Sequence, residues 1–154
     1  GSQRVLVDYA HTPDALYRVL KSLRTLTDGR LLCVFGAGGN RDPGKRPEMG
    51  AAVASVAEVG IVTSDNPRNE DPHAIIADIV EGMRQIKETN HTLRVVVEPD
   101  RRNAIAQALS MAGPEDIVLV AGKGHEPYQV IGDQVLNFDD RQVAAELMAA
   151  GGLN

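Results

Sequence analysis

A carboxylate, an amide and a guanidinium occur together in the short segment Asp65-Asn66-Pro67-Arg68. This set suits a zwitterion, because Arg68 can donate two parallel hydrogen bonds to a carboxylate while Asp65 faces an ammonium. Pro67 fixes its own backbone and restricts Asn66, so the loop has few conformations available. The alternative is a solvated turn in which Asp65 and Asn66 bond only their own backbone, although such a turn has no need of an arginine.

Two other clusters offer chemistry that fits a binding site. Asp8 and His11 end the first apolar segment, where a carboxylate could bind ribose hydroxyls and a histidine could lie near phosphate; helix capping by Thr12 is the alternative explanation. Residues 122–126 place two glycines where backbone can approach a ligand, and Glu126 offers a negative charge to an ammonium. Their alternative is a sharp turn between a strand and a hairpin.

Residues 39–45 read GNRDPGK and match the G-x-x-x-x-G-K spacing of a phosphate loop. Arg46 stands where a serine or threonine should bind Mg²⁺, and Pro43 lacks an N–H for phosphate, so we reject that interpretation. Arg41, Lys45 and Arg46 still allow an anion site in this glycine-rich loop. For the last two, a solvated helix start is an equal alternative.

Composition excludes several classes of protein. The net charge is -5 and no Lys/Arg tract is present, which argues against a nucleic-acid partner. No apolar run approaches the roughly 20 residues of a membrane segment. The histidines and Cys33 lack metal-ligand spacing, and no nucleophile triad or paired-carboxylate site is evident. Cys33 lies inside an apolar run and should be buried, which fits a cytoplasmic protein.

Apolar strand-like segments alternate with segments of helical periodicity. Strands are expected at residues 5–9, 31–35, 59–63, 93–97 and 117–121, with a hairpin at 128–131 and 134–138. Helices are expected to begin after the capping residues Thr12, Asp71, Asp100 and Asp139, and a small-residue helix should cover 49–57. Strands that are apolar throughout need cover on both faces. The sequence therefore predicts an α/β, Rossmann-like fold: a mostly parallel sheet of about six strands, helices on both faces and an antiparallel edge hairpin.

The polar clusters follow the first, second, third and fifth predicted strands. In a parallel sheet these loops all lie beyond the carboxyl ends of the strands, where ligands bind. Clusters that are distant in the sequence should therefore be neighbours in space. This placement favours a ligand contact for Arg68 over a simple turn.

At 154 residues the chain has the size of one domain. We interpret Gly1-Ser2 as a cloning scar and residues 3–154 as the domain. Because the chain opens directly into a strand, we expect it to be a piece of a longer polypeptide.

Four motifs together, in this order, resemble the C-terminal domain of a Mur ligase over nearly the whole chain. They are residues 8–14, residues 38–42 with Lys45-Arg46-Pro47, the Asp65-Asn66-Pro67-Arg68 segment and residues 122–126. In this family the Asp-Asn-Pro-Arg motif is typical of enzymes that add meso-diaminopimelate, whereas lysine-adding members differ there. The chain departs from the family pattern at Asn40, where aspartate is usual, and at Ala37, where cysteine is frequent.

The resemblance implies a share in peptidoglycan synthesis, and so in building the cell wall. ATP would phosphorylate a D-glutamate carboxylate on the precursor UDP-MurNAc-L-Ala-D-Glu, and an amine of meso-diaminopimelate would attack the acyl phosphate. The implied contacts with meso-diaminopimelate are Arg41, Asp65, Asn66, Pro67, Arg68, Gly122 and Glu126. Asp8 and His11 are the implied nucleotide contacts. ATP and Mg²⁺ would be bound mainly by a central domain that this chain lacks, so the fragment alone should be inactive.

Two alternatives remain open. The chain could belong to a lysine-adding or other Mur-type ligase, but that assignment predicts no arginine where Arg68 stands. It could also be a non-catalytic amino-acid-binding module, which should form a chain complete in itself.

Overall fold

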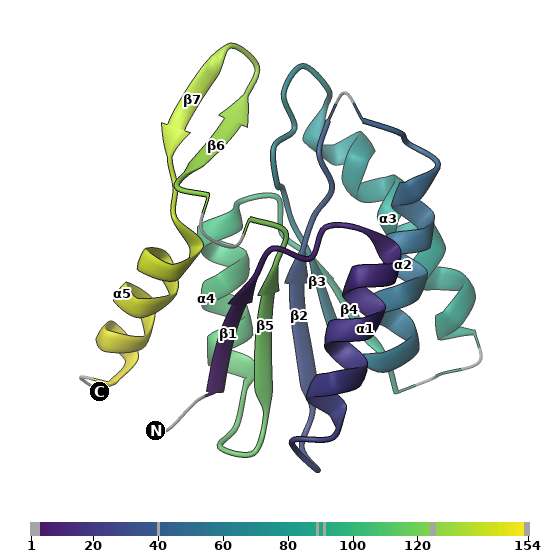
Figure 1. The fold of residues 1–154 in the computed structure, drawn as a ribbon, viewed down its shortest axis with the longest axis vertical. Helices are drawn as coiled ribbons and strands as arrows, with labels where there is room; N and C mark the ends of the chain where they lie inside the picture. Colours follow the sequence, from purple (N-terminus) through teal and green to yellow (C-terminus); the bar gives the residue numbers. More distant parts are fainter. Residues whose placement is uncertain (1–3, 40, 89, 91, 124–125, 153–154) are drawn as a thin grey trace.

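The computed structural model describes residues 4–39, 41–88, 90, 92–123 and 126–152. Its main sheet contains β1 (Arg4–Asp8), β2 (Leu31–Phe35), β3 (Val59–Val62), β4 (Arg94–Val97) and β5 (Ile117–Ala121). The spatial order is β1-β5-β2-β3-β4, and every neighbouring pair is parallel. All carboxyl ends therefore lie at one edge of the sheet, the upper edge in Figure 1.

The helices are α1 (Pro13–Arg24), α2 (Lys45–Val56), α3 (Pro72–Lys87), α4 (Arg101–Met111) and α5 (Asp140–Gly152). All four predicted caps are confirmed. The side chains of Thr12, Asp71, Asp100 and Asp139 accept hydrogen bonds from backbone N–H groups of the first turns of α1, α3, α4 and α5. Such caps satisfy N–H groups that have no partner inside a helix, so the local sequence determines where each helix begins.

The helices cover both faces of the sheet, as Figure 1 shows. Alternate residues of β2 point to opposite faces: Cys33 packs with α1, α2 and α3, while Leu32 and Val34 pack with α4 and α5. The central strands β2 and β5 are buried along their whole length. Burial also raises the pKa of the Cys33 thiol. The predicted α/β fold is confirmed.

One detail of the prediction needs correction. The hairpin of β6 (Tyr128–Ile131) and β7 (Gln134–Asn137) forms its own two-stranded sheet, so in the described part of the chain the main sheet has five strands and no antiparallel edge. The hairpin instead joins the loop after β3, where Arg68 pairs with Ile131 in an isolated parallel bridge. It consequently stands above the carboxyl edge of the main sheet (Figure 1).

Glycines allow α2 and α3 to pack backbone against backbone. A Cβ at Gly82 would lie 1.9 Å from the carbonyl oxygen of Pro47, and a Cβ at Gly50 would lie 2.1 Å from that of Ile79. A larger side chain at either position would force the helices apart, because rigid backbone atoms cannot move aside locally.

We expect Gly82→Ala to lower the free energy of unfolding by about 1–3 kcal/mol, as overpacking does, despite the higher helix propensity of alanine. Gly113→Ala is the control, because a Cβ there meets nothing closer than 3.6 Å. It should change stability by no more than about 1 kcal/mol. Urea unfolding of both variants is the measurement, and equal losses would contradict the packing argument.

Within the described residues, no helix is long and apolar enough to cross a membrane.

Candidate functional site

The loops that follow β1, β2, β3 and β5 meet at the carboxyl edge of the sheet, as predicted. Backbone hydrogen bonds join them. The N–H of Gly39 donates to the backbone oxygen of Asn66 at 2.7 Å, and the N–H of Gly122 donates to the backbone oxygen of Asp8 at 3.1 Å. A hollow of about 400 Å³ lies between these loops. Its lining consists of Tyr9, His11, Thr12, Pro13, Gly36, Ala37, Gly38, Arg41, Asp42, Lys45, Arg46, Met49, Asp65, Asn66, Arg68, Gly122, Glu126 and Tyr128.

The predicted amino-acid contacts lie together in this hollow, with one exception. Those that line it are Arg41, Asp65, Asn66, Arg68, Gly122 and Glu126. Pro67 is absent from the lining and supports the loop instead, since a Cβ at Gly39 would lie 1.8 Å from the Pro67 oxygen. Binding of a ligand by these residues stays a prediction. The predicted turn continues through residues 124–125, which lie outside the described residues, as does Asn40.

Only one of the two predicted nucleotide contacts lines the main hollow. His11 lines the hollow, whereas Asp8 does not. The Asp8 carboxylate accepts the N–H of Ala10 at 2.8 Å and so stabilises its own turn. Both residues line a shallower neighbouring hollow of about 390 Å³ at the start of α1. A nucleotide contact from either residue stays a prediction.

Asp65 forms an ion pair with Lys123, a buried residue that was not among the predicted contacts. The side chain of Lys123 is 0% exposed, and its Nζ lies 3.0 Å from Asp65 Oδ1. The other oxygen, Oδ2, lies near Gly122 at the hollow, 3.6 Å from the position of a Cβ there. Burial lowers the pKa of Lys123, while the Asp65 carboxylate acts in the opposite direction. The sequence offered only the position of Lys123 between two glycines as a signal.

Asn66 links three segments and is buried. Its Oδ1 accepts hydrogen bonds from Lys123 Nζ at 2.8 Å and from the N–H of Val130 at 2.9 Å. Its backbone oxygen accepts from Gly39. The amide therefore fixes the loop after β3 against the hairpin. The loop at Asn66 is thus not the solvated turn that the sequence left as an alternative.

Arg68 adopts a positive φ of 53°, the only non-glycine residue to do so among those described. Such backbone is unfavourable for a side-chain-bearing residue and persists only where the surroundings enforce it. Here the backbone N–H of Arg68 donates to the backbone oxygen of Val130 at 3.0 Å. The Nη1 atom of Arg68 donates to the backbone oxygen of Gly39 at 2.9 Å. Contacts with the hairpin and with the glycine-rich loop therefore hold this guanidinium at the lining of the hollow.

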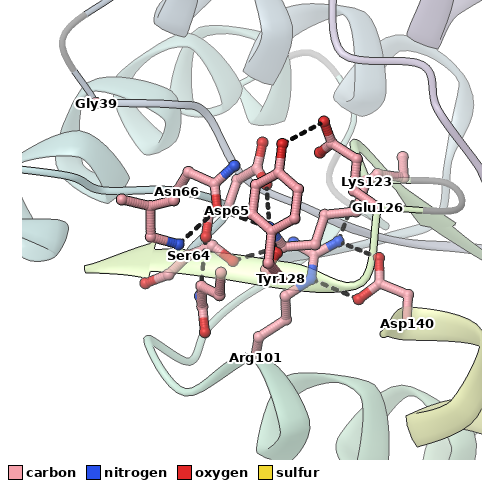
Figure 2. A network of polar contacts seen from close by, with 12 residues as sticks. Gly39, Ser64, Asp65, Asn66, Arg101, Lys123, Glu126, Tyr128 and Asp140 are labelled. Carbon is pink, nitrogen blue, oxygen red and sulfur yellow. Dashed lines mark hydrogen bonds and ion pairs between the residues drawn. The ribbon is translucent and has the colours of Figure 1, made fainter. Parts of the chain in front are cut away.

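A buried ion pair lies beneath the site, as Figure 2 shows. Arg101 and Asp140 have fully buried side chains with 2.6 Å between Nη2 and Oδ2. The same guanidinium donates to the backbone oxygens of Ser64 and Ala121, each at 3.0 Å. These bonds tie the loop after β3 and the carboxyl end of β5 to the starts of α4 and α5. Arg101 follows the cap Asp100, and nothing in the local sequence signals its burial.

Arg46 is neither the free anion binder nor the solvated helix start considered from the sequence. It is 3% exposed and pairs with Glu70 Oε2 at 2.7 Å and with Asp78 Oδ2 at 3.1 Å. Burial on its own would lower the pKa of Arg46, but its hydrogen bonds to the two carboxylates raise it overall. Arg46 therefore ties α2 to α3, whereas Lys45 is exposed beside the hollow.

The hollow presents charges of both signs to a ligand. Arg41, Lys45 and Arg68 supply positive charge, and Glu126 and Asp42 supply negative charge. Tyr128 donates its hydroxyl to Glu126 Oε2 at 3.3 Å, and the pKa of Tyr128 is raised chiefly by that carboxylate. Charges of both signs in one hollow suit a zwitterion that has carboxylates as well as an ammonium, and the binding of such a ligand stays a prediction.

Comparison with known proteins identifies the family. Residues 1–124 match the family described as "Mur ligase, glutamate ligase domain". Because the match covers well over half of the chain, the chain belongs to this Mur ligase family. The resemblance inferred from the sequence motifs is confirmed.

Relatives with more specific names are similar over nearly the whole chain. The UDP-N-acetylmuramoyl-L-alanyl-D-glutamate–2,6-diaminopimelate ligase of Syntrophomonas wolfei is 54% identical over 94% of this chain, and that of Clostridioides difficile is 52% identical over 94%. A solved structure of a ligase with this name has a TM-score of 0.90 at 44% identity and covers 99% of this chain. The chain spans 29% of each of the two curated relatives and 30% of the solved chain.

A more distant structure shares the fold alone. Escherichia coli FolC, in complex with ADP, has a TM-score of 0.54 at 22% identity, over 97% of this chain and 29% of that chain.

We expect Arg101→Met to lower the free energy of unfolding by about 3–5 kcal/mol, because it leaves the Asp140 carboxylate buried without a partner. Arg102→Met is the matched control on the same two helices: its pair with Glu146 is 48% and 47% exposed and should contribute less than about 1 kcal/mol. Denaturant unfolding of each variant is the measurement. Similar losses in the two variants would show that the buried pair has no special part in stability.

Proposed function

We propose that this chain is the C-terminal, amino-acid-binding domain of an ATP-dependent ligase that adds meso-diaminopimelate to UDP-MurNAc-L-Ala-D-Glu in peptidoglycan synthesis. The observation that carries the proposal is the arrangement of Arg68 and Arg41 with Glu126 around one hollow. Family membership and relatives at 54% identity that are named for this reaction support it.

The charges of the hollow suit the functional groups of meso-diaminopimelate. Each end of that molecule carries a carboxylate and an ammonium. In our proposal the guanidinium of Arg68 binds the carboxylate that lysine lacks, with Arg41 beside it. Glu126 and the outer oxygen of Asp65 accept hydrogen bonds from an ammonium. Gly122 leaves room for the ligand to approach the backbone.

The contribution of this chain would be to position the attacking amine, which can supply a large part of a rate enhancement. We propose that ATP, Mg²⁺ and the UDP-linked precursor bind mainly to the rest of the ligase, in the cytoplasm. Among the residues described here, no group of three or more His, Cys, Asp or Glu could hold a metal ion. Asp8 and His11 would reach one side of the nucleotide.

The isolated chain should bind ATP more weakly than about 1 mM and release no phosphate with ATP, precursor and meso-diaminopimelate. The physical reason lies in the glycine-rich loop: Pro43 has no N–H to offer phosphate, and Arg46 is committed to Glu70 and Asp78. Calorimetry and a phosphate-release assay are the measurements. Micromolar binding, or turnover by the chain alone, would contradict the proposal.

Arg68 should determine the choice of amino acid in the full-length ligase. Bound lysine would leave the guanidinium desolvated without a carboxylate, and a site of this kind can discriminate by about 10⁴-fold. We therefore expect Arg68→Ala to lower kcat/KM for meso-diaminopimelate steeply and that for lysine far less. Arg68→Lys should not restore activity, because an ammonium lacks the planar fork.

The control is Arg84→Ala, which removes an exposed guanidinium of α3 that pairs only loosely with Glu81, at 3.8 Å. It should leave kcat/KM for both amino acids unchanged. Equal losses on meso-diaminopimelate and lysine in Arg68→Ala would show that Arg68 supports the loop instead of recognising the substrate.

A further inference from the structure

The ammonium of Lys123 makes two hydrogen bonds and one ion pair. Nζ lies 2.8 Å from Asn66 Oδ1, 2.9 Å from the backbone oxygen of Tyr128 and 3.0 Å from Asp65 Oδ1. A protonated lysine has donors and no acceptor, so these oxygen partners are the kind that its burial requires. The side chain is fully buried, and it therefore lies behind the amino-acid site rather than in it.

These contacts join two of the loops that carry predicted ligand contacts. Asp65 and Asn66 belong to the loop after β3, whereas Lys123 and Tyr128 bracket the turn after β5. Within that turn the N–H of Glu126 donates to the oxygen of Lys123 at 2.9 Å. The side chain of Lys123 and its own backbone thus fix both ends of the segment that presents Glu126.

The same ammonium neutralises the charge of one of the two carboxylates, Asp65 and Glu126, that are proposed to bind the ligand. Asp65 is already paired with Lys123, and Arg101 with Asp140, so this buried cluster is neutral as a whole. Glu126 has the hydroxyl of Tyr128 as a neutral partner instead. Glu126 consequently presents a negative charge that the Lys123 ammonium does not compensate, while Asp65 presents one oxygen of a compensated pair.

We propose that Lys123 is a positioning residue of the amino-acid site. Its ammonium sets the spacing between the loop of Asp65 and Asn66 and the turn of Glu126, and this spacing determines the affinity for the diamino acid. The inference rests on the proposed function. It makes a specific claim, because a residue that only stabilised the fold would affect all substrates of the ligase alike.

The test uses the full-length ligase with Lys123→Met, which keeps most of the side-chain volume and removes the charge and donors. We expect the KM for meso-diaminopimelate to rise about tenfold or more, since small displacements of contact residues are costly. The KM values for ATP and for the UDP-linked precursor should stay within about twofold, because the loop and the turn that Lys123 joins carry neither of the proposed nucleotide contacts.

Arg30→Met is the matched control. It removes a cation from the pair with Asp116, at 3.0 Å, at the opposite edge of the sheet. The control should lower the melting temperature and leave every KM unchanged. A stability loss by itself would then be excluded as the cause of the effect at Lys123.

A double variant, Lys123→Met with Asp65→Asn, separates positioning from burial of a lone carboxylate. It removes both charges, so the melting temperature should recover toward that of the wild type. Because Asp65 is itself a proposed ligand contact, the reference is Asp65→Asn alone, and the KM for meso-diaminopimelate should be higher in the double variant than in that reference. If the single variant does not fold, the double variant carries the test.

The outcomes separate the two proposals. A wild-type ligase that does not use meso-diaminopimelate would overturn the proposed function and with it this inference. An active wild type with an unchanged KM for meso-diaminopimelate in the folded Lys123 variants would overturn the inference alone. A parallel rise in all three KM values would do the same.

Discussion

The guanidinium of Arg101 is the contact on which the candidate site depends. It is fully buried, and it satisfies the Asp140 carboxylate together with the backbone oxygens of Ser64 and Ala121. The oxygen of Ser64 lies in the loop after β3, and that of Ala121 ends β5. A buried ion pair does not by itself imply net stability, because desolvation offsets the attraction. Its geometric effect is clear, however: the loop after β3, the end of β5 and the starts of α4 and α5 are held in one arrangement.

A second buried cation, Lys123, extends this arrangement toward the ligand. The two cations and the carboxylates of Asp65 and Asp140 form a compensated cluster, visible in Figure 2, on which the loops rest. A site fixed in this way needs little reorganisation when it binds, and preorganisation of this kind favours both affinity and discrimination. The positive φ of Arg68 fits the same interpretation, because the hairpin and the glycine-rich loop hold that residue in a strained conformation.

Sequence patterns with a local physical cause predicted much of this molecule. Apolar runs such as that of β2 indicated buried parallel strands, and caps such as Thr12 marked the helix starts. The shared carboxyl edge then brought distant motifs together. Long-range contacts could not be predicted from the sequence. Arg101 pairs with Asp140, which is 39 positions away, and the buried Arg46 pairs with two carboxylates of the next loop and helix. The hairpin was wrongly predicted to lie at the edge of the main sheet. It meets the rest of the chain through the single bridge between Arg68 and Ile131, and one bridge produces no periodic pattern in the sequence.

The central claim is that a preformed charged hollow recognises the diamino acid. The most direct measurement is a crystal structure of the full-length ligase with meso-diaminopimelate bound. The account predicts one ligand carboxylate on the guanidinium of Arg68 and an ammonium on Glu126. The buried pairs of Asp65 with Lys123 and Arg101 with Asp140 should be unchanged. A ligand bound away from Arg68, or a rearrangement of these pairs on binding, would contradict it.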